Sequence, residues 1–543
     1  MPADPPAALY TGGEIVTLAP GHARPEALAT VGDRIVAVGE ESECRAALRS
    51  AGVADFSHLD LTGRCLLPGF IDTHLHPIAL VYFDLNADLR GVRSIAELQG
   101  VLRAAAARLP PGEWLVGLRL EDAELAERRL PARLELDAVS AERPIVVLKH
   151  DGHSAAGNSP ALAAAGIAAG TTDPPGGRIE RDTAGVPTGP CRESAAQLLF
   201  GAVPVSSLER LQATARTSFA RLSACGITSA GVVLQTDEEG PGGAAGRLES
   251  LALQLLLGEV PFCTYAILIG RSVGAALAAR STPLHNPSAG RRVGGFKIFA
   301  DGTFGSCTAS LREPFADRPE TRGFLTLAED EIFARMRAAH TAGLQVCVHA
   351  IGDAAVERCV TLFERLLREQ PRPDHRHRLE HASLVPPGVI GRIARCGLHV
   401  STQPLFIHSE KTWLPRRLGA ERARQAYPLR ALIDAGIVIG GASDAPVEST
   451  DVLHAIQCCV TREGFATEQA LTPLEAVRLF TRDAARLQFE EHEKGTLVAG
   501  KRADLVVLSA NPLEVAPERI AGIRVLRTIT GGRVVHDDRG DLA

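Results

Sequence analysis

Runs of apolar residues recur along the whole chain, and their spacing changes from one region to the next. Near both ends the runs are short and separated by Gly-rich turns, a pattern typical of β-strands. In the middle, strand-like runs alternate with segments whose apolar residues repeat with the period of an amphipathic helix. The pattern therefore predicts two all-β ends around an α/β centre.

The two ends are expected to share one domain. Each end alone offers too few strands and too little apolar surface to be stable, so both must contribute to one core. We predict a small β-sandwich domain built from residues 1–66 and 486–543. Its expected strands are 8–11, 14–18, 27–31, 34–38, 60–67, 495–508, 522–526 and 533–536.

The centre, residues 67–485, contains eight strand-like runs with helix-like segments between most of them. The strands are expected at 66–76, 226–231, 262–268, 295–301, 345–349, 376–381, 398–403 and 437–444. Clear helical patterns lie at 207–222, 330–342, 354–368 and 420–435. Eight strands in this alternation predict a (β/α)₈ TIM-like barrel, whose active site lies at the carboxyl ends of the strands.

One region, about 91–205, does not fit the barrel count. It contains a helical pattern at 95–109, strand patterns at 114–120 and 144–148, and a hairpin pattern that pairs 177–182 with 186–192. We interpret it as an insertion after the first barrel strand.

Composition narrows the class of protein. The chain has 543 residues, 45% of them hydrophobic and 22% charged, which is enough apolar material for a sizeable core. The net charge of −6 and the absence of long runs of one charge give no reason to expect nucleic acid or a membrane as a partner. The expected partner is a small-molecule substrate, and the expected assembly is a homodimer.

The first residues lack the basic and apolar segments of a secretory signal, and the small-residue run at 155–169 is interrupted by Pro160 and Gly166. The eleven cysteines include no Cys-x-x-Cys pair, so they are expected to be free thiols. These features predict a cytoplasmic protein.

Two histidines close the first predicted barrel strand. His74 and His76 are two residues apart, so an extended strand directs both side chains to the same face. Neutral imidazole is a common zinc ligand, and one rigid strand holds both rings in place. The pair therefore indicates a metal site.

Three more candidate ligands follow later barrel strands. His349 ends the fifth, His381 ends the sixth, and Asp444 ends the eighth. Each alone has a simpler explanation, because a strand-end histidine is often structural and an acidic residue there often caps the next helix. Four histidines and one aspartate at the ends of four strands of one barrel favour a common metal centre.

Lys297 stands out in a chain that has only five lysines, because it lies inside an apolar strand. Burial there disfavours the ammonium and favours the neutral amine. A neutral amine can add carbon dioxide to form a carbamate, an anion that could bridge two metal ions. The alternative is a lysine whose amine reaches solvent at the strand end.

This ordered set resembles the metal-dependent amidohydrolase superfamily, and in detail its amidohydrolase-3 branch, the YtcJ-like proteins that include N-substituted formamide deformylase. The matching segments are LPGFIDTHLH at 67–76, DGHSAAGNSPAL at 151–162, DPPGGRI at 173–179, KIFADGT at 297–303, HAIGD at 349–353, EH at 380–381, SDAPV at 443–447 and KRADLVVL at 501–508. The resemblance implies the predicted fold and six metal ligands, namely His74, His76, Lys297, His349, His381 and Asp444.

The resemblance also implies a reaction. One or two divalent metal ions, with zinc expected, would generate a hydroxide that attacks the carbonyl carbon of a small amide, N-formyl or N-acyl compound, and the C–N bond would then be cleaved. Lys297 as a carbamate would be a ligand, and Asp444 would accept the proton of the water and return it to the leaving nitrogen. His153, Asp151 and Asp301 are candidate substrate-binding residues.

Other reactions stay open at this point. An ester or lactone hydrolase could use the same residues. A deaminase is disfavoured, because such enzymes of this superfamily commonly have His-x-x-Glu where His349 stands, and here the third residue on is Gly352. A non-catalytic binding homologue would be expected to have lost ligands, and all six are present.

Overall fold

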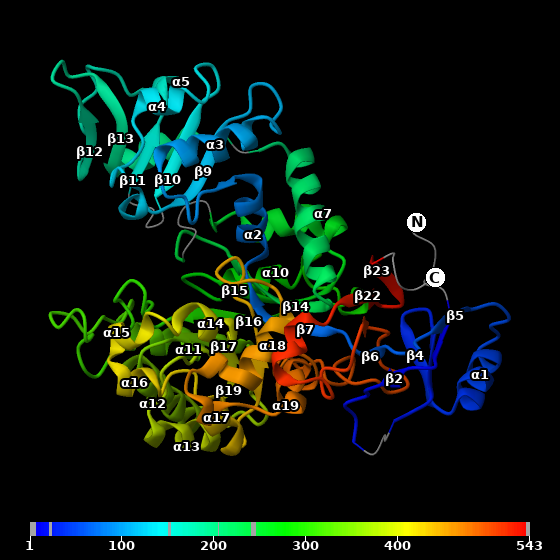
Figure 1. Cartoon of the computed structure of the whole chain (residues 1–543). Coiled ribbons are helices and arrows are strands. Elements are labelled where there is room, and N and C mark those ends of the chain that lie inside the picture. The colour runs from blue at the N-terminus through cyan, green and yellow to red at the C-terminus, as the bar shows by residue number, and fades with distance from the viewer. Residues whose placement is uncertain (1–6, 21–23, 150–153, 205, 241–245, 539–543) are drawn as a thin grey trace. The chain divides into compact units, whose positions relative to one another are not determined.

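The computed structural model describes residues 7–20, 24–149, 154–204, 206–240 and 246–538 (Figure 1). The chain forms two compact units. The first joins Met1–Ile78 with Phe219–Ala543, and the second is Ala79–Ser218. The first unit contains the barrel and the strands of both ends.

The barrel is an eight-stranded parallel sheet, which confirms the predicted fold. In order around the sheet its strands are β7 (Phe70–Leu75), β14 (Ile227–Gln235), β15 (Cys263–Ile269), β16 (Arg291–Phe299), β17 (Gln345–Ala350), β18 (Arg378–His381), β19 (His399–Thr402) and β20 (Ile439–Gly441). Hydrogen bonds join the end of β7 to the segment that follows β20. The N–H of Asp444 donates to His74 O, and the N–H of His76 donates to Ala445 O, both at 2.8 Å.

Helices follow most of the strands and cover the outside of the sheet (Figure 1). They are α9 (Glu249–Leu256), α10 (Gly274–Ala279), α11 (Glu329–Thr341), α12 (Asp353–Glu369), α13 (Pro387–Arg395), α14 (Leu405–Glu410), α15 (Leu414–Leu418), α16 (Ala420–Ala423), α17 (Leu429–Asp434), α18 (Val452–Thr461), α19 (Pro473–Leu479) and α20 (Arg482–Leu487). In α12 the buried Val356, Val360 and Phe363 recur at helical spacing. They form the apolar stripe that packs the helix on the sheet.

The prediction of one strand over 66–76 was wrong. The structure divides this segment at Gly69 into β6 (Cys65–Pro68) and β7. A Cβ atom at Gly69 would collide with the side chain of Thr228, and the Gly69 N–H donates to Asp504 O at 2.9 Å. The close approach of these neighbours explains why a residue without a side chain stands where the chain leaves one sheet for the next.

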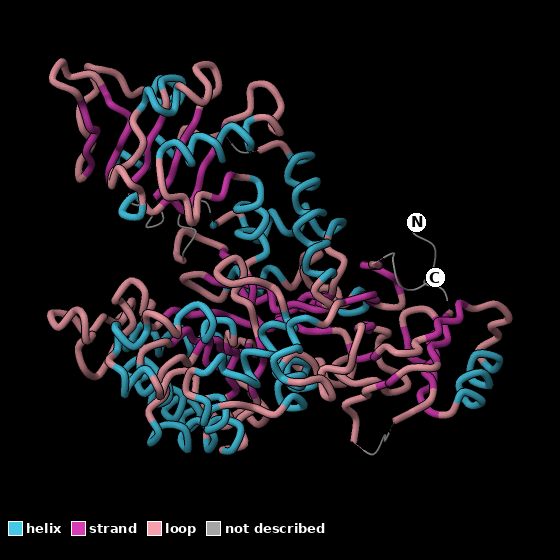
Figure 2. The backbone as a smooth tube through the Cα atoms, viewed as in Figure 1, coloured by secondary structure: helices cyan, strands magenta, loops and turns pink. Residues whose placement is uncertain are grey.

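The strands of both ends form two sheets (Figure 2). One contains β1 (Ala8–Thr11), β3 (Ala27–Val31), β4 (Arg34–Gly39) and β5 (Ser57–Asp60). The other contains β2 (Glu14–Ile15), β6, β21 (Leu505–Leu508), β22 (Val525–Thr530) and β23 (Arg533–Asp537). A helix that the sequence analysis did not predict, α1 (Glu41–Ser50), buries Cys44 and Leu48 against β3.

The core of these sheets draws on both ends of the chain. Leu28, Leu61 and Leu66 share one buried cluster with Leu505 and Val507. In the antiparallel pairing of β6 with β21, Leu66 lies opposite Val507. Neither end therefore encloses this core alone.

This shared core predicts a stability effect. Leu66→Ala and Leu505→Ala, one on each terminal segment, are each expected to lower the free energy of unfolding by about 2–5 kcal/mol, because each leaves a cavity in a packed core. Guanidinium denaturation of each variant measures the effect. An unchanged free energy of unfolding in either variant would contradict a core that both ends share.

The second unit is organised around a six-stranded sheet. Its order is β12 (Gly177–Arg181), β13 (Pro187–Glu193), β11 (Ser154–Gly157), β10 (Ile145–Lys149), β9 (Leu115–Leu120) and β8 (Ala87–Asp88). Helices α3 (Ile95–Ala106) and α6 (Ser194–Gly201) contribute to its two buried clusters. The predicted hairpin is confirmed, since β12 pairs antiparallel with β13. The unit is wider than the predicted 91–205, because α2 (Pro77–Leu85) and most of α7 (Leu208–Ala224) complete it.

Among the described residues, no helix combines the length and the apolar character that crossing a membrane requires.

Candidate metal centre

The structure brings the six predicted ligands to one end of the barrel. His74, Lys297, His349 and His381 lie in β7, β16, β17 and β18, His76 follows β7 directly, and Asp444 is the third residue after β20. Neighbouring rings are close: the centroids are 5.4 Å apart for His74 and His76, 5.3 Å for His74 and His381, and 4.5 Å for His349 and His381. Parallel strands end at the same edge, so their last residues meet there.

Asp444 lies against both histidines of the first strand. Its Oδ1 is 3.3 Å from His74 Nε2 and 3.3 Å from His76 Nε2. The possible ligand atoms of these three residues all lie within 4.8 Å of one another. Three donors this close to one another can bind one ion.

The backbone is strained at two of the ligands. His381 has a φ of 71° and Asp444 a φ of 55°, both in the left-handed region that most residues avoid. Such conformations cost about 1–3 kcal/mol each and are found most often at functional sites. In a regular strand, His381 and its neighbour Glu380 would point to opposite faces of the sheet. The positive φ at His381 ends this regular alternation.

A buried carboxylate orients His74. The Nδ1 of His74 lies 2.5 Å from Glu380 Oε2, and Arg378 donates to the other oxygen of Glu380. Burial raises the pKa of Glu380, but Arg378 and His74 outweigh burial and hold this pKa well below its usual range. Because a carboxylate only accepts hydrogen bonds, Nδ1 carries the proton and Nε2 keeps its lone pair.

Two other histidines are oriented in the same way. The Nδ1–H of His381 donates to Gln403 Oε1 at 2.9 Å, which leaves Nε2 unprotonated. The Nε2–H of His349 donates to the carbonyl of Gly302 at 3.1 Å, which leaves Nδ1 unprotonated. Each ring therefore keeps one nitrogen able to bind a metal ion.

The protonation states suit a divalent cation. Burial lowers the pKa of His74 to about 4, that of His381 to about 3, and that of His349 well below its usual value. Burial raises the pKa of Asp444, but the adjacent His74 and His76 outweigh it and hold the pKa well below the usual range. At neutral pH the site thus offers neutral imidazoles and one carboxylate, the donor set that zinc binds.

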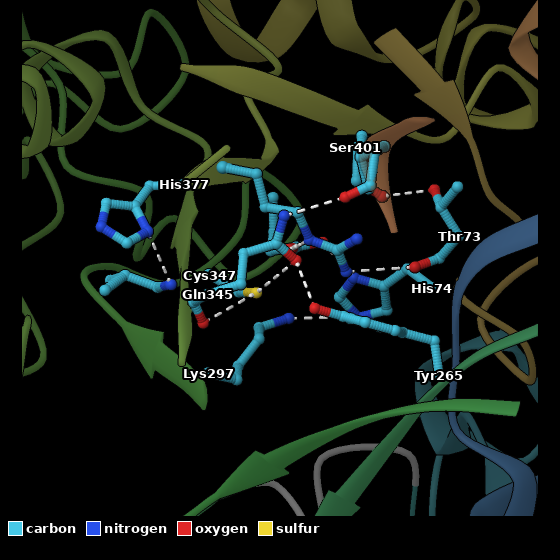
Figure 3. Close-up of polar contacts among 12 residues, drawn as sticks. Thr73, His74, Tyr265, Lys297, Gln345, Cys347, His377 and Ser401 are labelled. Carbon is cyan, nitrogen blue, oxygen red and sulfur yellow. Dashed lines mark hydrogen bonds and ion pairs between the residues drawn. The ribbon is translucent and has the colours of Figure 1, made fainter. Parts of the chain in front are cut away.

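Lys297 is buried in β16 and directed into the same site (Figure 3). Its Nζ lies 3.1 Å from His74 Nε2 and 4.9 Å from the centre of the Phe299 ring. Burial is the main cause that lowers the pKa of this lysine. The lower pKa makes the neutral form of the amine easier to reach, and only this form adds carbon dioxide to give a carbamate.

Asp301 follows β16 and accepts three backbone hydrogen bonds. It accepts the N–H groups of Ser310, Ile351 and Gly352 at 2.9, 3.0 and 2.8 Å. Burial raises the pKa of Asp301 to about 7. These contacts hold the segment after β16 against the residues that follow β17, the strand that contains His349.

The predicted substrate contacts stay predictions. Asp301 lies near the centre, with its Oδ1 3.6 Å from His349 Nε2. Asp151 and His153 lie outside the described residues.

Several positioning residues were not assigned from the sequence. Arg378 and Glu380 could have been found, since strand alternation places both on the inner face of β18. Asp72 accepts the N–H of His74 at 3.0 Å and that of Ser443 at 3.1 Å, so it joins β7 to the segment that carries Asp444. A role of this kind depends on a contact between distant segments, and a single sequence does not show it.

Gln403 provides a test of the hydrogen bonds that orient the candidate ligands. Gln403→Leu removes the acceptor of the His381 Nδ1–H but keeps a side chain of similar size. Loss of such an outer partner typically weakens metal binding or activity by about 10–100-fold. Metal affinity and melting temperature should be measured together. An unchanged affinity at an unchanged melting temperature would show that Gln403 does not position His381.

The chain is similar over most of its length to known proteins. The sequence model of the amidohydrolase family matches residues 58–536. The chain is 29% identical to YtcJ of Bacillus subtilis (strain 168), covering 98% of this chain and 99% of that protein. It is 28% identical to the N-substituted formamide deformylase of Arthrobacter pascens, covering 95% of each. Among solved structures, an uncharacterized metal-dependent hydrolase from Pyrococcus furiosus is 27% identical, with a TM-score of 0.75 over 94% of this chain and 100% of that one.

Proposed function

The chain belongs to the amidohydrolase family, and on this premise we propose that it hydrolyses the C–N bond of a small amide, with N-formyl compounds as the first choice of substrate. At the coarser level it is a metal-dependent hydrolase of the amidohydrolase superfamily. The observation that carries the proposal is the convergence of His74, His76 and Asp444, whose possible ligand atoms lie within 4.8 Å of one another.

The residues present fit a bound divalent ion, and we propose zinc. His74, His76, His349, His381 and Asp444 would hold one or two ions, and Lys297 as a carbamate would be a further ligand. When bound, such an ion supplies Lewis-acid chemistry: it acidifies water and polarises a carbonyl oxygen.

Asp444 is the proposed proton carrier. Its carboxylate is ionised at neutral pH, because the surrounding histidines lower its pKa. It can therefore accept the proton of the attacking water and donate it to the leaving nitrogen. Glu380 and Gln403 keep His74 and His381 in the tautomers that leave their Nε2 atoms unprotonated.

The choice of a C–N bond over an ester bond is supported by one relative. The Arthrobacter pascens protein that is 28% identical over 95% of this chain is an N-substituted formamide deformylase. An amine is a poor leaving group unless it gains a proton, and Asp444 offers a group that can return one.

The test combines metal analysis with matched substrates. The purified chain should contain a divalent metal, and it should release amine from N-formyl or N-acyl amines in an assay that includes the corresponding esters. Removal of the metal with a chelator should abolish the release, and added zinc should restore it. Hydrolysis of esters alone, with no amine released from any amide, would contradict the C–N assignment.

The other expectations stay predictions. They are the homodimer, the small-molecule nature of the partner and the cytoplasmic location.

A further inference from the structure

A second group of possible metal ligands lies away from the catalytic residues. It consists of His408 in α14, His454 in α18 and Glu463 in the short helix η4 (Arg462–Gly464). Their possible ligand atoms all lie within 4.8 Å of one another. The proposed reaction uses none of these residues.

Both histidines point at the same carboxylate. His408 Nδ1 lies 3.0 Å from Glu463 Oε1 and 2.9 Å from Oε2, and His454 Nε2 lies 3.0 Å from Oε1. The two rings are 4.7 Å apart and meet edge to face. Ligands of one tetrahedral zinc ion, each about 2.0–2.2 Å from it, lie roughly 3.3–3.6 Å apart. Small side-chain movements would bring the three atoms to that spacing.

Hydrogen bonds hold the carboxylate of Glu463 in position. Lys411 donates to Glu463 Oε2, and both rings lie 3.0 Å from Oε1, where the Cys458 thiol also donates at 3.4 Å. Glu463 thus presents Oε1 to both imidazoles, while Oε2 accepts from Lys411 and also lies 2.9 Å from His408 Nδ1.

The turn that carries Glu463 is anchored from inside the protein. Arg462 and Glu463 both have positive φ, 54° and 47°. The buried Arg462 guanidinium donates to Tyr427 O at 2.9 Å and Ala426 O at 3.2 Å. These bonds hold the turn in the costly conformation that places the Glu463 carboxylate between the two histidines.

We propose that His408, His454 and Glu463 form a second metal site, which takes a zinc-class divalent cation with water in the remaining positions. Two histidines and one glutamate are a known zinc-binding set. The alternative is a cluster of ion pairs around Glu463 without a metal ion. The metal site is favoured because histidines of two helices that are far apart in the sequence approach the same carboxylate oxygen.

The place of the site in the fold gives the ion a structural role. In α14, Phe406 precedes His408 by two residues, and its ring stacks on that of His381 at 6.3 Å. Helix α18 follows the segment that contains Asp444. An ion between His408 and His454 would therefore join the two segments that flank these catalytic residues.

The test counts zinc ions on the full-length protein. Wild type, Glu463→Gln and His408→Gln are stripped with a chelator, loaded with zinc alone, desalted and analysed for metal per chain. We expect each variant to hold one zinc ion fewer than wild type, while the zinc of the catalytic centre is common to all three. Zinc should also raise the melting temperature of wild type more than that of either variant.

The controls separate this site from general binding to histidine. His492→Gln is the control variant, because it removes an exposed histidine outside the proposed site. The His492 side chain is 91% exposed, and that of His408 is 51% exposed. The control variant should bind as much zinc as wild type. If Glu463→Gln fails to fold, His408→Gln carries the test, since this half-exposed side chain can change without opening the core. Equal zinc counts in wild type and His408→Gln would overturn the proposal and leave an ion-pair cluster only.

Discussion

Asp444→Asn is expected to lower the turnover of the metal-loaded protein by about 10²–10⁴-fold, the usual contribution of general acid–base catalysis. Asparagine keeps the shape of the side chain but does not accept the proton of water at neutral pH. The fold should survive, because asparagine is among the residues best tolerated at the left-handed φ of 55° found here.

The measurement is kcat with a substrate found in the amine-release assay, together with bound metal and melting temperature. Asp451→Asn is the matched control, because Asp451 is the N-cap of α18 and asparagine caps helices as well as aspartate does. This control should keep wild-type activity. Wild-type turnover in Asp444→Asn would remove Asp444 from the role of proton carrier.

Lys297→Ala is expected to lower metal affinity and activity together. The loss should exceed the roughly 10–100-fold that is typical when a residue that hydrogen-bonds a ligand is removed. If Lys297 is a carbamate ligand, the variant loses an anionic ligand of the metal centre. Short carboxylates such as formate or acetate should then restore part of both quantities, because they can enter the vacated space and take the place of the carbamate.

Lys297→Met distinguishes a ligand from a packing residue. Methionine fills much of the same volume and is apolar, so it suits a buried strand position. It should lose metal as the alanine variant does, and added carboxylates should not restore it, because the side chain occupies the space they need. Full metal content in either variant would show that Lys297 is no ligand.

Much of the fold could be predicted from the sequence, because it depends on local patterns. Strand-like runs alternating with helical ones imply a barrel, and the predicted strand at 345–349 differs from β17 by one residue. The division at Gly69 was missed because an apolar run does not show which sheet each part joins. That depends on the close packing of Thr228 and on the hydrogen bond to Asp504, residues far away in the sequence.

The sequence by itself determined which residues stand at the ends of the barrel strands, since period and order follow from local chemistry. Residues such as His74 and His349 could therefore be assigned to one site from the order of the strands alone. Only the tertiary structure decided how these groups are oriented. The contact of Glu380 with His74 and the convergence of His408 and His454 on Glu463 join side chains from separate elements. Their geometry depends on how those elements pack, and no spacing along the chain encodes it.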